Sequence, residues 1–258
     1  MDIMQTPVLG GPAPRHASRT ARKLAGFASR HIYAPEHSQE RRYLDVGCGN
    51  GFVTELVGAE CDEVVGIDVE PTRLEDFRDH AEGNARITVL LMSAASMRFS
   101  SNYFSLITCF EVLEHVPDLS ACVREICRVC KPGGAVVISV PQVWFPFENH
   151  GMRIGKRTYS GKILFLPYIR PLHRKLSNAR VFSSGEMDRR FLSNGMELLE
   201  TGYASPQFER AAVSPGSWEN RFTFLRDVLN QCEKIPILRV LTGVSMLKAY
   251  RKNYNLSE

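Results

Sequence analysis

Short apolar runs alternate with segments of helical periodicity along the first half of the chain. The runs have the length of buried strands, and in the segments between them apolar residues recur every three or four positions. Strands that alternate with helices form parallel sheets through right-handed crossovers. The pattern therefore predicts an α/β fold around a mostly parallel sheet, with strands at 42–46, 63–67, 87–91, 104–110 and 135–140.

Local signals predict where the helices begin and end. Pro71 suits the first turn of a helix, and Gly83 suits its C-terminal stop. Asp118 is a good N-cap for the next helix, whose apolar stripe we extend through Cys127 and Cys130. The sequence Lys-Pro-Gly-Gly that follows turns the chain into the fifth strand.

After the fifth strand, aromatic, basic and proline residues interrupt this rhythm. We interpret the interruption as a cap over the carboxyl ends of the strands, where ligands of such sheets bind. Periodicity then resumes, with a helix near Met187, a strand at 197–201, a helix at 222–232 and a last strand within 240–250. The predicted division is a basic N-terminal tail and helix at 1–35, the core at 36–141, the inserted cap at 142–184 and the C-terminal part of the sheet at 185–258.

The chain has 258 residues, of which 44% are hydrophobic, enough for one domain with a cap. Its net charge of +4 is too small to indicate nucleic acid or anionic lipid by itself. The cysteines are odd in number and lie mostly within apolar patterns, which indicates a reduced protein. No apolar stretch is long enough for a transmembrane segment. We predict a cytoplasmic protein; the alternative is that residues 1–35 are an organelle transit peptide.

Glycines gather in the turn between the first strand and the first helix, in a GxGxG pattern at Gly47, Gly49 and Gly51. Such a turn bends sharply and lets a ligand approach the backbone. Asp68 ends the second strand, where an acid can bind both hydroxyls of a ribose. A dinucleotide loop would have glycine or alanine in place of Phe52. Asp45 would face a diphosphate badly but would suit a cationic group, so the loop favours adenosine with a positively charged tail.

Four blocks resemble one family, in the order 45–52, 66–68, 110–118 and 131–134. Together they resemble class I S-adenosylmethionine-dependent methyltransferases, above all the methyltransferase type 11 branch that contains ubiquinone-pathway O-methyltransferases. The resemblance covers about residues 42–141. It implies a Rossmann-like, seven-stranded, mostly parallel sheet with an antiparallel edge, helices on both faces and an inserted cap, and it implies S-adenosyl-L-methionine as cofactor.

The resemblance also implies the cofactor contacts. The glycine loop would lie under the methionine part, Asp68 would hold the ribose, and Phe110 and Glu111 would lie beside the sulfonium. Ser93 stands where many relatives have an aspartate near the adenine, so that contact is the weakest of the set. The full set of predicted cofactor-binding residues is Asp45, Gly47, Cys48, Gly49, Asn50, Gly51, Asp68, Val69, Ser93, Ala94, Phe110 and Glu111.

A hydroxyl acceptor would need a base near the methyl group. His115 is our first candidate, with Glu114 and His150 as further candidates. The alternative is that Glu114 and His115 only cap the following turn. Glu111, Glu114 and His115 also have the spacing of metal-dependent relatives, so a divalent metal is an alternative that we do not favour.

We predict methyl transfer, O-directed, to a small aromatic, quinone-like or lipid-linked acceptor. A second interpretation is a metal-assisted RNA 2′-O-methyltransferase, but the small net charge disfavours a nucleic-acid partner. A third is a cofactor-binding module without turnover. Segment 162–175 mixes apolar and basic residues, which suits either an ordinary packed helix pair or a peripheral contact with a membrane.

Overall fold

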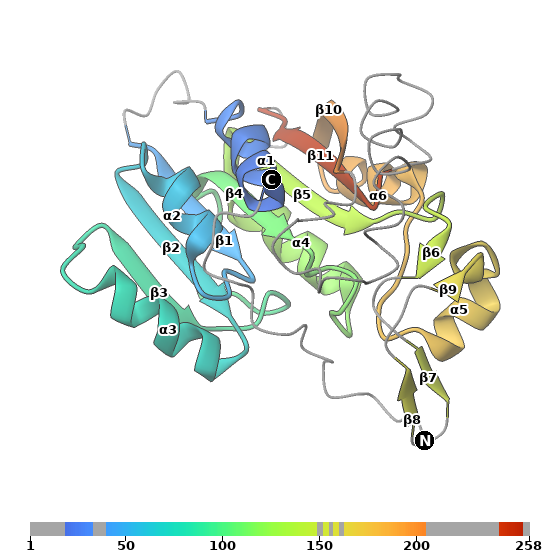
Figure 1. Cartoon of the computed structure of the whole chain (residues 1–258). Helices are drawn as coiled ribbons and strands as arrows, with labels where there is room; N and C mark the ends of the chain where they lie inside the picture. The colour runs from blue at the N-terminus through green and yellow to red at the C-terminus, as the bar shows by residue number, and fades with distance from the viewer. Residues whose placement is uncertain are drawn as a thin grey trace.

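The computed structural model describes residues 19–32, 40–148, 152–154, 157–159, 163–204 and 243–254. Its centre is a seven-stranded sheet with the strand order β10-β11-β5-β4-β1-β2-β3 (Figure 1). The first half of the chain contains β1 (Arg42–Val46), α2 (Phe52–Gly58), β2 (Glu63–Asp68), α3 (Pro71–Ala81), β3 (Ile87–Leu91), β4 (Phe104–Phe110), α4 (Leu119–Val129) and β5 (Cys130–Pro141).

The antiparallel part of the sheet comes from the end of the chain. β11 (Ser245–Lys252) lies between β5 and β10 (Met196–Ala204) and runs antiparallel to both. The other neighbouring pairs are parallel. The Rossmann-like, mostly parallel seven-stranded sheet predicted from the sequence is therefore confirmed.

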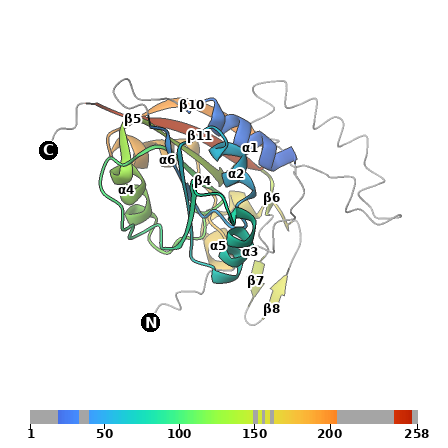
Figure 2. The same cartoon turned by 90° about the vertical axis from the view of Figure 1, so that its left-hand side faces the viewer.

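Helices cover both faces of the sheet (Figures 1 and 2). α1 (Arg19–Ser29), α2 and α3 lie on one face, and α4 and α6 (Ser184–Leu192) lie on the other. Successive residues of a strand point to opposite faces. Tyr43 therefore packs in the hydrophobic core between the sheet and helices α1 and α2, and Leu44 packs in the core between the sheet and helices α4 and α6. Because both faces are covered, the central strands are continuous apolar runs.

The predicted helix ends are mostly confirmed. Pro71 opens α3, and the Asp118 carboxylate accepts a hydrogen bond of 2.9 Å from the backbone N–H of Ala121, as an N-cap does. The stripe assigned to α4 was wrong at its end, because the helix stops at Val129 and Cys130 begins β5. Cys130 is still buried, so its apolar character serves the sheet rather than the helix.

The last strand also differs from its prediction. It was placed within 240–250, but β11 runs from Ser245 to Lys252, and the predicted helix at 222–232 lies outside the described residues. Lys248 is fully buried on this strand, with its Nζ 2.6 Å from Oδ1 of Asp188. The Tyr250 hydroxyl donates to the same oxygen at 3.0 Å. This network, which the apolar pattern could not show, fastens β11 to α6.

Small elements follow β5 and lie beyond its carboxyl end (Figure 1). They are β6 (Phe147–Glu148) paired with β9 (Ile163–Leu164), β7 (Met152–Ile154) paired with β8 (Arg157–Tyr159), the short helix η1 (Leu166–Tyr168) and α5 (Arg170–Leu176). The boundaries that we gave the cap stay a prediction. None of the helices in the described ranges is both long and apolar enough to cross a membrane.

Candidate active site

The turn between β1 and α2 depends on its glycines. Gly47, Gly49 and Gly51 have φ angles of 79°, 55° and 80°, in the left-handed region that glycine adopts without strain. A Cβ atom on Gly47 would lie 2.2 Å from Cγ2 of Val112, and one on Gly51 would lie 2.1 Å from the ring of Phe77. A Cβ on Gly49 would have no atom of the described chain within 4 Å, apart from its sequence neighbours. Gly47 and Gly51 thus serve packing, whereas Gly49 borders open space.

The backbone N–H groups of this turn donate within the protein. Those of Gly47 and Cys48 donate to the carbonyl of Ile67 at 2.7 and 3.0 Å, and that of Gly51 donates to the carbonyl of Cys48 at 3.0 Å. A diphosphate is held by N–H groups that point at the ligand. Because these N–H groups are already engaged, the turn offers little to a diphosphate. This agrees with the interpretation drawn from Phe52.

Asp68 fixes the turn to the end of β2. Its Oδ2 accepts from the N–H of Gly49 at 3.0 Å, and its Oδ1 accepts from the N–H groups of Val69 and Glu70 at 2.7 and 3.0 Å. The N–H of Met92 donates to the backbone carbonyl of Asp68 at 2.9 Å, which brings the end of β3 alongside. The carboxylate is thus held in one orientation beside the turn, with a neutral partner at each contact.

Two further predicted residues follow β3 directly. Ser93 is exposed and its Oγ accepts from the N–H of Ala95 at 3.2 Å, while Ala94 is buried. Val69, at the end of the neighbouring strand, is 52% exposed, unusual for valine. An exposed valine beside a fixed carboxylate suits contact with the flat face of a nucleobase.

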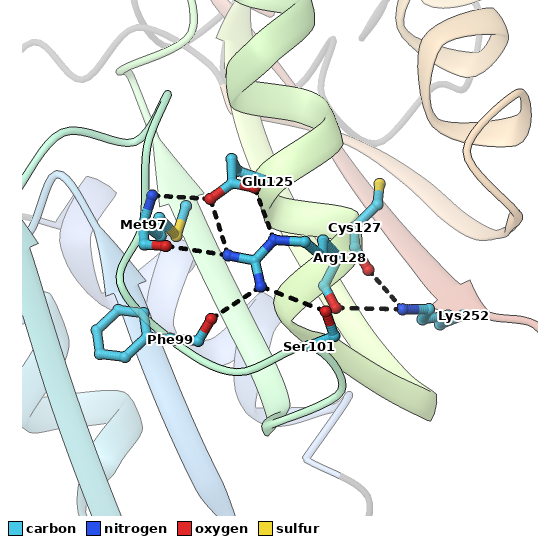
Figure 3. Close-up of polar contacts among 7 residues, drawn as sticks. All are labelled: Met97, Phe99, Ser101, Glu125, Cys127, Arg128 and Lys252. Atoms are coloured by element: carbon cyan, nitrogen blue, oxygen red, sulfur yellow. Dashed lines mark hydrogen bonds and ion pairs between the residues drawn. The ribbon is translucent and has the colours of Figure 1, made fainter. Parts of the chain in front are cut away.

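The segment between β3 and β4 is clamped by α4 (Figure 3). The Arg128 guanidinium donates to the carbonyl of Met97 at 3.0 Å, and Glu125 accepts from the N–H of Met97 at 2.7 Å. Lys252 closes the end of the same helix, because its Nζ donates to the carbonyl of Cys127 at 2.7 Å. The clamp holds the segment that begins with Ser93. Sequence reasoning missed it, although a Glu-x-x-Arg pair on a helix was a usable signal.

Asp45 is buried below the turn and ties three elements together. It accepts hydrogen bonds from the hydroxyls of Thr54 on α2 and Thr108 on β4, at 2.6 and 2.7 Å. Burial raises the pKa of Asp45 to about 6, although the two hydroxyl donors act to lower it. Neither threonine could be predicted as a partner of Asp45, because they come close to it only in the folded sheet.

The segment after β4 brings Glu111, Glu114 and His115 together. Glu111 has a φ of 54°, and the Ser139 hydroxyl donates to its Oε1 at 2.7 Å. Such a conformation costs a residue with a Cβ about 1 kcal/mol, and strained residues of this kind gather at functional sites. Nε2 of His115 lies 3.8 Å from Oε1 of Glu114.

Glu114 is buried, and its oxygens accept no hydrogen bond from the described residues. Burial, followed by the nearby Glu111 carboxylate, raises the pKa of Glu114 well above its usual range. Burial therefore favours the protonated form of this carboxyl, which weakens it as a proton acceptor. Of the predicted bases, His115 stays the stronger candidate, and His150 lies outside the described residues. The described ranges bring no three His, Cys, Asp or Glu side chains into an arrangement that could hold a metal ion.

Comparison with known proteins agrees with this geometry. Residues 44–138 match the family model of a methyltransferase domain. The ubiquinone biosynthesis O-methyltransferase of Alkalilimnicola ehrlichii is 39% identical over 101 residues, which are 38% of this chain and 41% of that protein. The chain thus spans less than half the length of the curated relatives that it matches. The chain contains a class I S-adenosylmethionine-dependent methyltransferase domain.

Solved structures show the same fold for the methyltransferase domain. An S-adenosylmethionine-dependent methyltransferase from Mesorhizobium loti has a TM-score of 0.57 at 18% identity, over 89% of this chain and 98% of that one. A geranyl diphosphate methyltransferase in complex with S-adenosylmethionine has a TM-score of 0.61 at 16% identity, over 93% of this chain and 92% of that one.

Three other predicted cofactor residues of the methyltransferase domain have distinct surroundings. The Cys48 side chain is buried against Leu74 and Phe77, so only its backbone can face a ligand. Asn50 is partly exposed at the tip of the turn, and Phe110 is half-buried at the end of β4. The ends of β1, β2, β3 and β4 therefore carry the predicted set at one edge of the sheet, because parallel strands end on the same side.

Proposed function

We propose that this protein transfers a methyl group from S-adenosylmethionine to an oxygen atom of a small aromatic, quinone-like or lipid-linked acceptor. One observation carries the cofactor part. The turn keeps its own N–H groups engaged, leaves open space at Gly49 and lies against the fixed carboxylate of Asp68. The acceptor part rests on the likeness to ubiquinone biosynthesis O-methyltransferases over the matched region.

We assign the cofactor to the edge formed by the ends of β1, β2 and β3. Gly47 to Gly51 would lie under its amino-acid part, with Asp45 below as the counter-charge of the amino group. Asp68 would accept hydrogen bonds from the ribose hydroxyls, and Val69 with Ser93-Ala94 would border the adenine. When bound, S-adenosylmethionine supplies a methyl group that its sulfonium has already activated. The protein then has only to align the acceptor oxygen, exclude water and take up one proton.

We assign the proton to His115, which would accept it from the acceptor hydroxyl. The raised pKa of Glu114 favours its protonated form, so this carboxyl, 3.8 Å from Nε2, would not compete for the proton. Glu111, held by Ser139, would border the same space. No step of this scheme needs a metal ion.

Exposed apolar side chains on the cap support a lipid-linked acceptor. Phe165 and Ile169, on either side of η1, are 55% and 52% exposed, and the ring of Phe165 stacks on Tyr168. Aromatic and aliphatic side chains at this position could receive a prenyl or acyl chain, or touch a membrane surface peripherally.

Replacing His115 with glutamine is expected to lower turnover at least tenfold while the affinity for S-adenosylhomocysteine stays unchanged. A positioned general base contributes about 10²–10⁴-fold to a rate, and glutamine keeps the size of the side chain but accepts no proton. Initial rates and calorimetric titration on the same samples check this. The control is His80→Gln, at an exposed position of α3. Full turnover in the His115 variant would remove this residue from the base role.

The affinity for S-adenosylhomocysteine is expected to fall as the pH drops below about 6. The folded-state pKa of Asp45 is raised to about 6, so a carboxylate that pairs with the ligand ammonium is lost by protonation below that value. The stability of the ligand-free protein depends on pH in the opposite direction. Because the pKa of Asp45 is raised in the folded state, this group makes the fold more stable at pH 4 than at pH 7.

Titrations between pH 5 and pH 8 should therefore show up to about tenfold weaker binding at pH 5. Asp45→Asn should bind more weakly and show a flat profile. A wild-type profile that is equally flat would contradict the counter-charge role.

The proposed activity is tested with a cell extract and S-adenosylmethionine labelled on its methyl group, followed by mass spectrometry of the products. We expect one class of small molecule or lipid to gain the label on oxygen, with and without a chelator. Label found on RNA, or transfer abolished by the chelator, would favour the metal-assisted alternative. Absence of transfer despite cofactor binding would favour the binding-module alternative.

A further inference from the structure

A small cavity in the cap is lined by arginines. Its walls come from Arg170 and Arg174 on α5 and from Arg180, which follows that helix. Its floor contains the buried side chains of His173 and Phe182. The cavity has a volume of about 20 Å³. This is enough for one or two atoms the size of a water oxygen but too small for an aromatic ring or a prenyl chain.

Positive charge exceeds negative charge around this cavity. Glu186 is the one acidic side chain among the described residues that line it. Its carboxylate already has two partners, Arg170 at 2.7 Å and Arg190 at 3.6 Å. Arg174 and Arg180 therefore add two positive charges that Glu186, the acid among the described lining residues, does not balance. A bound anion would offset this excess of positive charge.

The cavity adjoins the proposed acceptor side of the active site. The N–H of Arg180 donates to the carbonyl of Glu114 at 3.2 Å, and its guanidinium donates to the carbonyl of Pro117 at 3.2 Å. Both contacts fasten the wall of the cavity to the segment that carries His115. A group bound beside Arg180 would thus lie next to the segment that carries His115.

We propose that the mouth of this cavity is a subsite for an acidic group of the methyl acceptor, a carboxylate or a phosphate, with one of its oxygens inside the cavity. Guanidinium groups bind both through paired, charge-assisted hydrogen bonds. The subsite places the acid on the cap side and the methylated oxygen near His115. The inference rests on the proposed function, because it takes the segment after β4 as the acceptor side.

The test titrates inorganic phosphate and benzoate, separately and at constant ionic strength, into the full chain. Each anion is added to the wild type, Arg174→Gln, Arg180→Gln and the control Arg189→Gln, which is exposed on α6 and does not line the cavity. We expect at least one anion to bind at about millimolar concentration. The anion that binds identifies phosphate or carboxylate as the recognised group. Binding should weaken at least tenfold in the first two variants and stay unchanged in the control.

The inference is overturned if neither anion binds, or if all three variants bind equally well. Arg174 is exposed, so its variant answers the question even if Arg180→Gln does not fold. S-adenosylhomocysteine is titrated into the same samples. If it binds, but the anion affinity is the same in Arg174→Gln, Arg180→Gln and the wild type, only the subsite is contradicted. If it does not bind to the wild type, the proposed function itself fails.

Discussion

Gly51→Ala is expected to lower the free energy of unfolding by about 3 kcal/mol, whereas Gly49→Ala should lower it by about 1 kcal/mol. Both residues have positive φ angles, so each alanine is destabilised by adopting a left-handed backbone conformation. Only the Cβ on Gly51 would also meet the buried ring of Phe77, at 2.1 Å. Urea denaturation of the two variants measures the difference.

The same pair separates folding from binding. A methyl group on Gly49 enters the space that we assign to the cofactor, so this variant should fold nearly normally and bind S-adenosylhomocysteine at least tenfold more weakly. Normal affinity in Gly49→Ala would mean that the cofactor does not pass close to this backbone. Equal stability of the two alanine variants would contradict the packing of Phe77 against the turn.

Asp68→Ala is expected to weaken S-adenosylhomocysteine binding about tenfold to a hundredfold, which corresponds to about 1–3 kcal/mol. The variant loses the acceptor for the ribose hydroxyls and also the acceptor that holds the N–H of Gly49. Calorimetric titration measures the affinity, with Asp79→Ala on the exposed side of α3 as the control. An affinity equal to that of the wild type would contradict the ribose assignment.

The arrangement of the fold could be predicted from the sequence because its signals are local. Each central strand is an apolar run whose length fits a strand, and Pro71 and Asp118 mark helix starts through their own backbone chemistry. The error at Cys130 has the same origin. An apolar residue at helical spacing fits either the last turn of α4 or the start of β5, and only the sheet decides between them.

Part of the candidate site could also be predicted from the sequence, because its signals are local. The positive φ angles of the turn follow from a GxGxG pattern at a strand-to-helix junction. The partners of Asp45 could not be predicted, since Thr54 and Thr108 reach it from a helix and from another strand. The clamp of Arg128 on Met97 and the buried Lys248 are likewise contacts between distant segments. Such contacts leave no periodic trace in the sequence.

The raised pKa of Glu114 is another property that could not be predicted from the sequence. From the sequence, Glu114 and His115 were both candidates for the base, because both follow β4. Burial next to Glu111 distinguishes the two residues, since it raises the pKa of Glu114 and so favours the protonated form of that carboxyl. Burial of this kind depends on tertiary packing, which the sequence pattern does not show.

The central claim is that the turn at 47–51 with Asp68 receives an adenosyl thioether with an amino-acid tail and not a dinucleotide. Calorimetric titration of the full chain with S-adenosylhomocysteine and, separately, with NAD tests it most directly. We predict binding of S-adenosylhomocysteine at about micromolar concentration and at least a hundredfold weaker binding of NAD. Comparable affinity for NAD, or no heat of binding with S-adenosylhomocysteine, would contradict the account.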